Sequence, residues 1–239
     1  MARPDARRFD SFASDYAYWR TVELQLELYE DLLDFVPRPD VIALDAGCGS
    51  GPLAGHLASR CRAVIGIDIS LAMLHLAQRE CRRHGITNVH LVAGDLEAPP
   101  FRASVFGFVL ACYSLQHTPL ELTLPALRRT IAGDGRLAIA AFVSHNPHRD
   151  ANWLWAEVYW LRQAPYYLRR HGLRVAWRIM RFLVGRRWIN HVTRHGKLTL
   201  ERLADECARV LPGYRIETRG QLAKVRWDAA GSPTRSAPA

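Results

Sequence analysis

The sequence is poor in lysine and has no paired cysteines. Of its 239 residues only two are Lys, against 30 Arg, and the five Cys stand singly, without a Cys-x-x-Cys pair. An odd number of scattered cysteines predicts a protein of a reducing compartment and argues against a disulfide framework.

Long apolar runs are also missing. No stretch approaches 18 uninterrupted apolar residues, and the first residues, Met-Ala-Arg-Pro-Asp-Ala-Arg-Arg, lead into mixed polar sequence rather than the apolar segment of a signal peptide. The composition, 49% hydrophobic and 23% charged, is that of an ordinary globular chain. We therefore expect a soluble, cytoplasmic protein with one large domain or a domain carrying a sizeable insertion.

Two phosphate-binding signatures are absent from the glycine-rich turn at 45–52, Asp-Ala-Gly-Cys-Gly-Ser-Gly-Pro. A dinucleotide fingerprint needs its third glycine three residues after the second, where this chain has Pro52. No Gly-Lys-Ser/Thr follows, which excludes a P-loop. The glycines still let the backbone turn sharply and approach a ligand closely, although a plain strand-to-helix turn would use them in the same way.

Short apolar strands alternate with amphipathic helices along most of the chain. Ser70 and Thr199 are expected to cap the helices that they precede, and Arg219-Gly220-Gln221 separates the two strands of a predicted hairpin. This alternation predicts an α/β fold with a doubly wound, mostly parallel sheet covered on both faces. The predicted strands are 41–44, 63–67, 89–92, 105–111, 136–142, 214–218 and 222–227, and the predicted helices are 20–36, one from about residue 52, 70–83, 120–132 and 199–211.

Three carboxylates follow three successive predicted strands: Asp45, Asp68 and Asp95. A doubly wound sheet binds its ligand at the carboxyl ends of its strands, and an acid there can accept hydrogen bonds from both ribose hydroxyls. So much negative charge disfavours a phosphate group. The pattern therefore predicts a ligand that contains ribose.

With these motifs in register, the sequence resembles the class I S-adenosylmethionine-dependent methyltransferases of the small-molecule type. The resemblance covers about 9–143 and 198–227 and implies a seven-stranded sheet in the order 3-2-1-4-5-7-6, with S-adenosyl-L-methionine as cofactor. One departure is Gly107, where many members carry Asp. The matching segments are 43–51, 66–74, 94–101 and 133–137, together with Phe9 and Tyr16 in an aromatic pattern before the first helix.

The resemblance also implies roles for individual residues. The Gly47–Gly49 backbone would hold the methionine end of the cofactor and Asp45 its amino group. Asp68 would take the ribose hydroxyls, Asp95 with Leu96 the adenine edge, and Cys112 the methionine arm. The implied cofactor-binding set is Tyr16, Asp45, Gly47, Cys48, Gly49, Asp68, Ile69, Met73, Asp95, Leu96 and Cys112.

The segment 112–117 would face the point of methyl transfer in this family, and His117 is the candidate catalytic base or acceptor-orienting residue. A hydrogen-bonded structural histidine fits the sequence as well. An Asn/Asp-Pro-Pro-Tyr motif is absent, which disfavours methylation of nucleobase amino groups. The spacings His145-x-x-His148 and His191-x-x-x-His195 lack a supporting Cys or carboxylate set, so we predict no metal site.

Positive charge is concentrated in one segment. Residues 145–197 hold two acidic residues, eleven basic residues and five of the seven Trp. We therefore predict a helical insertion after the fifth strand. The predicted organisation is an N-terminal helical cover (1–40), a cofactor-binding core (41–144), a basic, Trp-rich substrate lid (145–197), the end of the core (198–227) and a flexible tail (228–239).

Within the insertion, Arg170, Arg174, Arg178 and Arg181 recur at helical spacing beside a wide apolar face, and 153–161 is apolar nearly all round. We expect the two helices to pack together over the active site, with the Arg stripe in water, shielding an apolar acceptor. Peripheral contact with the inner face of a membrane through 153–188 stays open. Nucleic-acid binding is less favoured, because the aromatics are expected on the buried face.

The sequence thus predicts a methyltransferase acting on a small, apolar or amphiphilic molecule such as a lipid, a quinone or a secondary metabolite. One alternative is an RNA methyltransferase that uses the Arg stripe. The other is a non-catalytic cofactor-binding module that acts through the insertion as an interaction surface.

Overall fold

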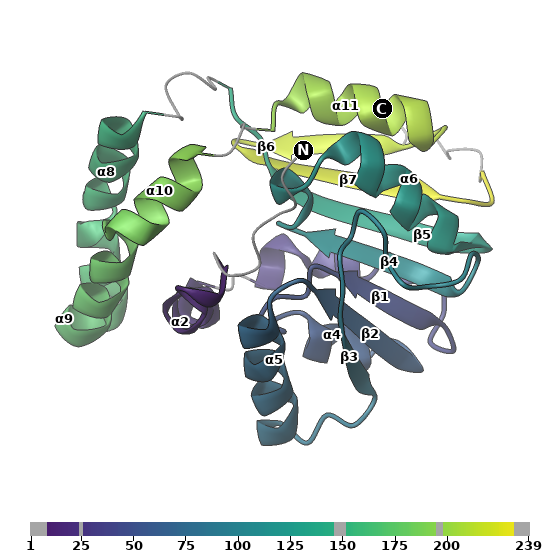
Figure 1. Ribbon diagram of the computed structural model, residues 1–239, viewed down its shortest axis with the longest axis horizontal. Coiled ribbons are helices and arrows are strands. Elements are labelled where there is room, and N and C mark those ends of the chain that lie inside the picture. Colours follow the sequence, from purple (N-terminus) through teal and green to yellow (C-terminus); the bar gives the residue numbers. More distant parts are fainter. Residues whose placement is uncertain (1–8, 24–25, 146–151, 195–197, 232–239) are drawn as a thin grey trace.

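A computed structural model describes residues 9–23, 26–145, 152–194 and 198–231 (Figure 1). Its centre is a seven-stranded sheet in the order β3-β2-β1-β4-β5-β7-β6, which confirms the predicted fold class and strand order. The first five strands run parallel, and β7 is antiparallel to both β5 and β6. The strands are β1 (Ile42–Ala46), β2 (Ala63–Asp68), β3 (Val89–Ala93), β4 (Phe106–Cys112), β5 (Ile131–Phe142), β6 (Arg215–Arg219) and β7 (Leu222–Asp228).

The sheet separates two hydrophobic cores. Along β4, Val109 and Ala111 face a core shared with α6 (Leu120–Thr130) and α11 (Leu200–Val210), whereas Phe108 and Leu110 face a core shared with α3 (Glu30–Leu33) and α4 (Ala54–Ala58). This alternation follows from the two-residue period of a strand. Because both faces are covered, β4 is continuously apolar, as expected of a central strand in a parallel sheet.

Local signals placed several element boundaries correctly. The Ser70 hydroxyl accepts a hydrogen bond from Met73 N (3.1 Å) at the start of α5 (Leu71–Arg83), and the Thr199 hydroxyl accepts one from Arg202 N (3.2 Å) at the start of α11. The hairpin of β6 and β7 is also confirmed. The strand predicted at 136–142 begins earlier, at Ile131, directly after α6.

The single helix predicted at 20–36 is wrong. The structure instead has α2 (Ala13–Glu23), a 3₁₀ turn η1 (Leu26–Leu28) and the short helix α3. Leu32 and Leu33 are fully buried in the core that α3 and α4 share with the sheet, whereas Val22 packs against a separate cluster with the insertion. The two ends of this segment serve different cores, and a straight helix would not reach both.

The insertion forms three helices, α8 (Trp153–Arg162), α9 (Ala164–Leu183) and α10 (Arg186–Arg194). They lie together beside the sheet, at the left of Figure 1, with α2 between α9 and α5. Helix α9 is kinked at Gly172, whose φ of 76° and ψ of 171° are non-helical, a conformation that glycine tolerates readily. The predicted four-arginine stripe assumed one continuous helix, so the kink separates Arg170 from the other three arginines.

The expectation that the insertion helices bury their apolar faces against each other is wrong for α8. Trp153, Trp155 and Tyr159 are each at least 50% exposed. The buried face of the insertion belongs mainly to the second half of α9, where Ile179 and Leu183 pack with the N-terminal Phe12. Across the described residues, no helix combines the length and apolar character needed to cross a bilayer.

Candidate functional site

The glycine turn after β1 takes a shape that needs glycine. Gly47, Gly49 and Gly51 have φ values of 77°, 54° and 80°, which other residues rarely adopt. A Cβ at position 47 would lie 2.3 Å from the Ser114 Cβ. Gly47 N and Cys48 N both donate to the Ile67 carbonyl, at 2.8 and 3.0 Å. The turn is thereby fixed to the end of β2, with its backbone close to the segment that follows β4.

Asp68 is oriented by the backbone at the end of β2. Its Oδ2 accepts a hydrogen bond from Gly49 N (2.8 Å) and its Oδ1 accepts one from Ser70 N (2.9 Å). Each carboxylate oxygen can accept a second hydrogen bond. The side chain is therefore held in one orientation and keeps acceptor capacity toward the cavity that it lines.

The carboxyl groups of this site are held in an unfavourable environment. Asp45 is only 3% exposed, and burial, together with the negative charge of Asp68, raises its pKa to about 7. Burial also raises the pKa of Asp68, an effect that the hydrogen bonds from the backbone oppose. Two acids in a poorly solvated place favour a cationic ligand, which would stabilise their ionised forms.

A buried guanidinium lies on the wall of the same cavity. Arg20 is 9% exposed, and its Cζ lies 5.1 Å from the centre of the Tyr113 ring. The Tyr29 hydroxyl donates to the Tyr113 hydroxyl at 2.8 Å. The site therefore carries both negative and positive charge, as a zwitterionic ligand requires.

The N-terminal segment is bound directly to the rim of the site. The Ser70 hydroxyl donates to Asp10 Oδ1 at 2.5 Å, and the same oxygen accepts a longer bond from Ala72 N (3.3 Å). Asp10 thus interacts with the exposed N–H groups at the start of α5. This contact holds Phe9 and Tyr16 on the cavity wall.

His117 ends the 3₁₀ turn η2 (Leu115–His117) that connects β4 to α6. Its ring packs edge-on against Phe9, with centroids 5.5 Å apart, and lies 5.0 Å from the ring of His191 on α10. The insertion therefore contributes an aromatic side chain next to the candidate catalytic residue.

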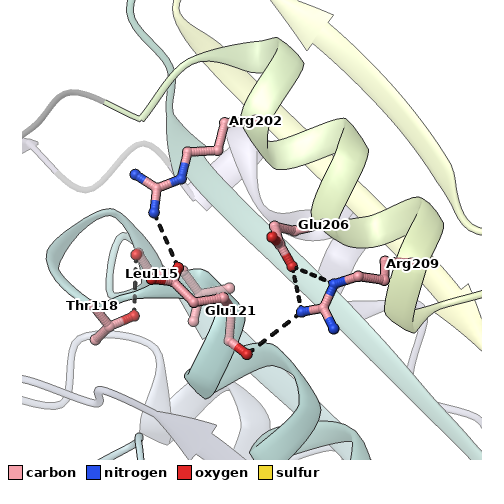
Figure 2. A network of polar contacts seen from close by, with 6 residues as sticks. All are labelled: Leu115, Thr118, Glu121, Arg202, Glu206 and Arg209. Carbon is pink, nitrogen blue, oxygen red and sulfur yellow. Dashed lines mark hydrogen bonds and ion pairs between the residues drawn. The ribbon is translucent and has the colours of Figure 1, made fainter.

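Polar contacts anchor the start of α6, next to this turn (Figure 2). The Thr118 hydroxyl donates to the Leu115 carbonyl (3.2 Å), which closes the turn. Arg202 of α11 donates to the Glu121 carboxylate (3.0 Å), and Arg209 donates to the Glu121 carbonyl (3.5 Å). Exposed contacts of this kind contribute little stability singly, but together they fix the direction in which α6 leaves η2.

All twelve predicted site residues line one cavity, which encloses about 960 Å³ including its mouth. The structure thus brings these residues together, and their individual roles remain predictions. They are Tyr16, Asp45, Gly47, Cys48, Gly49, Asp68, Ile69, Met73, Asp95, Leu96, Cys112 and His117.

Arg20 lines the cavity but was not among the predicted site residues, and Tyr113 and Ser114, which also line it, were included only within the segment 112–117. Arg20 follows Tyr16 by four residues and therefore shares its helix face, a signal that could have found it. Tyr113 has a φ of 56°, unusual for a residue with a side chain. Of the two histidine pairs, His148 and His195 lie outside the described residues.

Comparisons with known proteins agree with this geometry. Residues 43–135 match a family model described as a methyltransferase domain. Over 114 residues the chain is 37% identical to nocamycin O-methyltransferase of Saccharothrix syringae, covering 45% of this chain and 40% of the relative. It is 31% identical over 143 residues to the ubiquinone/menaquinone biosynthesis C-methyltransferase of Blochmanniella pennsylvanica, covering 52% and 56%. The matched part thus spans about half the length of these relatives or less.

A solved structure extends the likeness to the whole fold. A putative S-adenosyl-L-methionine-dependent methyltransferase from Methanococcus maripaludis aligns with a TM-score of 0.63 at 14% identity, covering 95% of this chain and 96% of that one. At that identity the likeness concerns the fold. It agrees with the strand order described above.

Proposed function

We propose that this chain, which carries a methyltransferase domain over residues 43–135 and the strand order of the class I fold, is a class I S-adenosylmethionine-dependent methyltransferase that transfers a methyl group from S-adenosyl-L-methionine to a small, apolar or amphiphilic acceptor. One observation carries this proposal. The side chains of Asp45, Asp68 and Asp95 and the glycine turn at Gly47 line the same cavity. The names of the two curated relatives, nocamycin O-methyltransferase and a ubiquinone/menaquinone biosynthesis enzyme, support the small-molecule class.

The residues present fit the cofactor. A Cβ at Gly49 would meet no atom within 4 Å, so the turn leaves open space beside its backbone where a ligand could approach. The buried Asp45, whose pKa is raised to about 7, would be relieved by an ammonium group or a sulfonium. Asp68 would accept the ribose hydroxyls, and Asp95 with Leu96 would contact the adenine edge. When bound, S-adenosylmethionine supplies a methyl group that is already activated by the positive charge on sulfur.

Arg20 completes the match at the amino-acid end of the cofactor. Its buried guanidinium lines the cavity, and a carboxylate is the group that a guanidinium binds best. We assign it to the methionine carboxylate, while Asp45 takes the amino group. The Gly47–Gly49 backbone and Cys112 would hold the chain between these two groups.

On the acceptor side, His117 is proposed to orient the acceptor and to take its proton where one must leave. The Phe9 ring, which lines the cavity beside His117, would give that part of the cavity an apolar wall. Because the methyl donor is already activated, most of the rate enhancement would come from holding acceptor and donor in line. The general base would contribute about 10² to 10⁴-fold.

Two measurements test the proposal. Calorimetry with S-adenosylhomocysteine should show binding that Asp68→Ala weakens at least about 100-fold, while Asp205→Ala, an exposed change on α11, leaves it intact. Incubation of the chain and methyl-labelled donor with fractionated cell extract should then transfer the label to a small molecule. Absence of cofactor binding would refute the whole proposal. Binding without any labelled product would favour the non-catalytic module, and label in RNA would favour the RNA methyltransferase.

A further inference from the structure

The outer side of α8 and α9 exposes an unusual amount of apolar surface. Every side chain of α8 is at least partly exposed, and most of the large exposed apolar side chains of the described residues lie on these two helices. So many large, exposed apolar side chains on two neighbouring helices are more typical of an interaction site than of ordinary protein surface. We call it the α8–α9 surface: Trp153, Leu154, Trp155, Val158, Tyr159, Leu161, Tyr166, Leu168, Leu173 and Trp177.

The same helices carry a large excess of positive charge. Between 152 and 193 the chain has eight Arg and one acidic residue, Glu157. In the described part of the chain, the ion pairs involve none of these eight arginines. Three of them interact with the N-terminal segment instead, Arg170 electrostatically with Glu23, Arg178 with the Tyr18 ring and Arg187 with the Ser11 carbonyl, and the charge of exposed arginines such as Arg174 and Arg181 is available to a negatively charged partner.

Apolar and basic side chains adjoin on the exposed side of α9. Beyond the kink, Leu173 (73% exposed) and Trp177 (62%) are one turn apart. At about 100° per residue, Arg174 and Arg181 follow directly beside them, and the Arg181 guanidinium lies 5.1 Å from the Trp177 ring centre. The opposite side of the helix is buried against α2. Trp and Leu next to Arg, on the outer side of a helix, is the pattern of a helix that lies in a membrane interface.

We propose that the α8–α9 surface docks on a lipid bilayer that contains anionic phospholipids. Its Trp and Leu side chains would enter the boundary between headgroups and acyl chains, and its arginines would bind the phosphates. Two copies of this face would bring their positive charges together, which opposes self-association. A nucleic acid would satisfy the arginines but would leave Leu154, Leu161 and Leu173 exposed to water. Docking goes beyond the proposed methyl transfer and does not depend on it.

Vesicle flotation with the full chain tests the docking. Vesicles of phosphatidylcholine alone are compared with vesicles of phosphatidylcholine and phosphatidylglycerol in a 7:3 ratio, at about 50 and 500 mM salt. We expect the chain to float with the anionic vesicles at low salt, to bind less at high salt, and to bind neutral vesicles weakly. Equal binding to both vesicle types, or binding to neither, would overturn the proposal.

Two sets of variants separate the contribution of the Trp side chains to vesicle binding from that of the Arg side chains. Trp153→Ser/Trp155→Ser/Trp177→Ser should lower the partition coefficient more than tenfold, and Arg174→Gln/Arg181→Gln about 25-fold, because each positive charge near an anionic surface contributes about fivefold. Leu122→Ser on α6 and Arg215→Gln on β6 are exposed controls away from the α8–α9 surface and should bind as the wild type does. Melting temperatures would establish that each variant is folded. If the two control variants lost as much vesicle binding, the assignment of binding to the α8–α9 surface would be overturned.

Brominated lipids supply a readout that folding defects do not imitate. Bromine on the acyl chains quenches only the Trp side chains that enter the bilayer, so bound wild-type chain should lose Trp fluorescence. Trp153→Phe/Trp155→Phe/Trp177→Phe should float with the vesicles and lose most of that quenching. Unchanged quenching in this variant would overturn the proposed surface. A dimer in solution that the Trp→Ser variant disrupts, or binding of RNA in preference to anionic vesicles, would overturn it as well.

Discussion

We expect the buried carboxyl group of Asp45 to make cofactor affinity dependent on pH. In the free protein the pKa of Asp45 is raised to about 7, so below pH 7 the carboxyl is mostly protonated and cannot attract a cation. The proposed amino group of the cofactor would restore the carboxylate to an ordinary pKa near 4. Binding then requires loss of a proton below pH 7, and affinity falls about tenfold for each pH unit.

The difference between these two pKa values of Asp45 sets the size of the pH effect on cofactor affinity. We expect S-adenosylhomocysteine to bind up to about 30-fold more weakly at pH 5.5 than at pH 8, a difference of about 2 kcal/mol. Asp45→Asn should remove this pH dependence and weaken binding at pH 8 by about 2 kcal/mol, the contribution of a charge-assisted hydrogen bond. Methylthioadenosine lacks the amino-acid group, so its affinity should be nearly independent of pH. Titration calorimetry between pH 5.5 and 8.5 measures all three.

The pH dependence of the free energy of unfolding tests the raised pKa of Asp45 independently of cofactor binding, because the direction of the change with pH is known. A carboxyl with a raised pKa in the folded state destabilises the fold as pH rises from about 4 to 7, because the folded state holds a proton that the unfolded state releases. The cost is complete above pH 7 and is at most about 4 kcal/mol. Asp45→Asn should therefore melt at a higher temperature than the wild type at pH 8, with the difference vanishing near pH 4. A pH slope of cofactor affinity that survives in Asp45→Asn would refute this reasoning.

Three further substitutions test the rest of the site. Asp68→Ala should weaken S-adenosylhomocysteine binding at least about 100-fold by calorimetry, since a carboxylate fixed by Gly49 N and Ser70 N is lost; unchanged affinity in a folded variant would exclude the ribose role. His117→Ala should lower kcat about 10² to 10⁴-fold with cofactor affinity retained, and full activity would make the residue structural. Gly47→Ala should cost about 1–3 kcal/mol of stability in denaturant unfolding, because its φ is 77° and its Cβ would clash with Ser114; wild-type stability would contradict this geometry.

Local chemistry made part of the fold and site readable from the sequence. Ser70 and Thr199 cap their helices because a hydroxyl beside a helix start satisfies free N–H groups, whatever the rest of the chain does. Asp45 and Asp68 converge because parallel pairing places the carboxyl ends of β1 and β2 side by side. The alternation of strands and helices, together with a few capping and turn residues, is enough to predict both the helix caps and the convergence of these two acids.

Other features depend on contacts between distant segments. The break in the helix predicted at 20–36 arises because Leu33 and Val22 pack in different hydrophobic clusters. Arg20 reaches the cavity only because α2 is held against α5, through Asp10 and Ser70. The approach of His191 to His117 joins residues on α10 and η2. Helical periodicity carries no information about such neighbours.

The sequence by itself determined the sheet, the glycine turn and the three acidic strand ends, because each follows from short-range backbone preferences and from the register of parallel strands. Tertiary structure alone decided which side of the insertion is buried. Periodicity shows that a helix has an apolar face, but the available partners determine whether that face is covered. Here the inner face of α9 packs against α2, and the Trp side chains of α8 remain exposed.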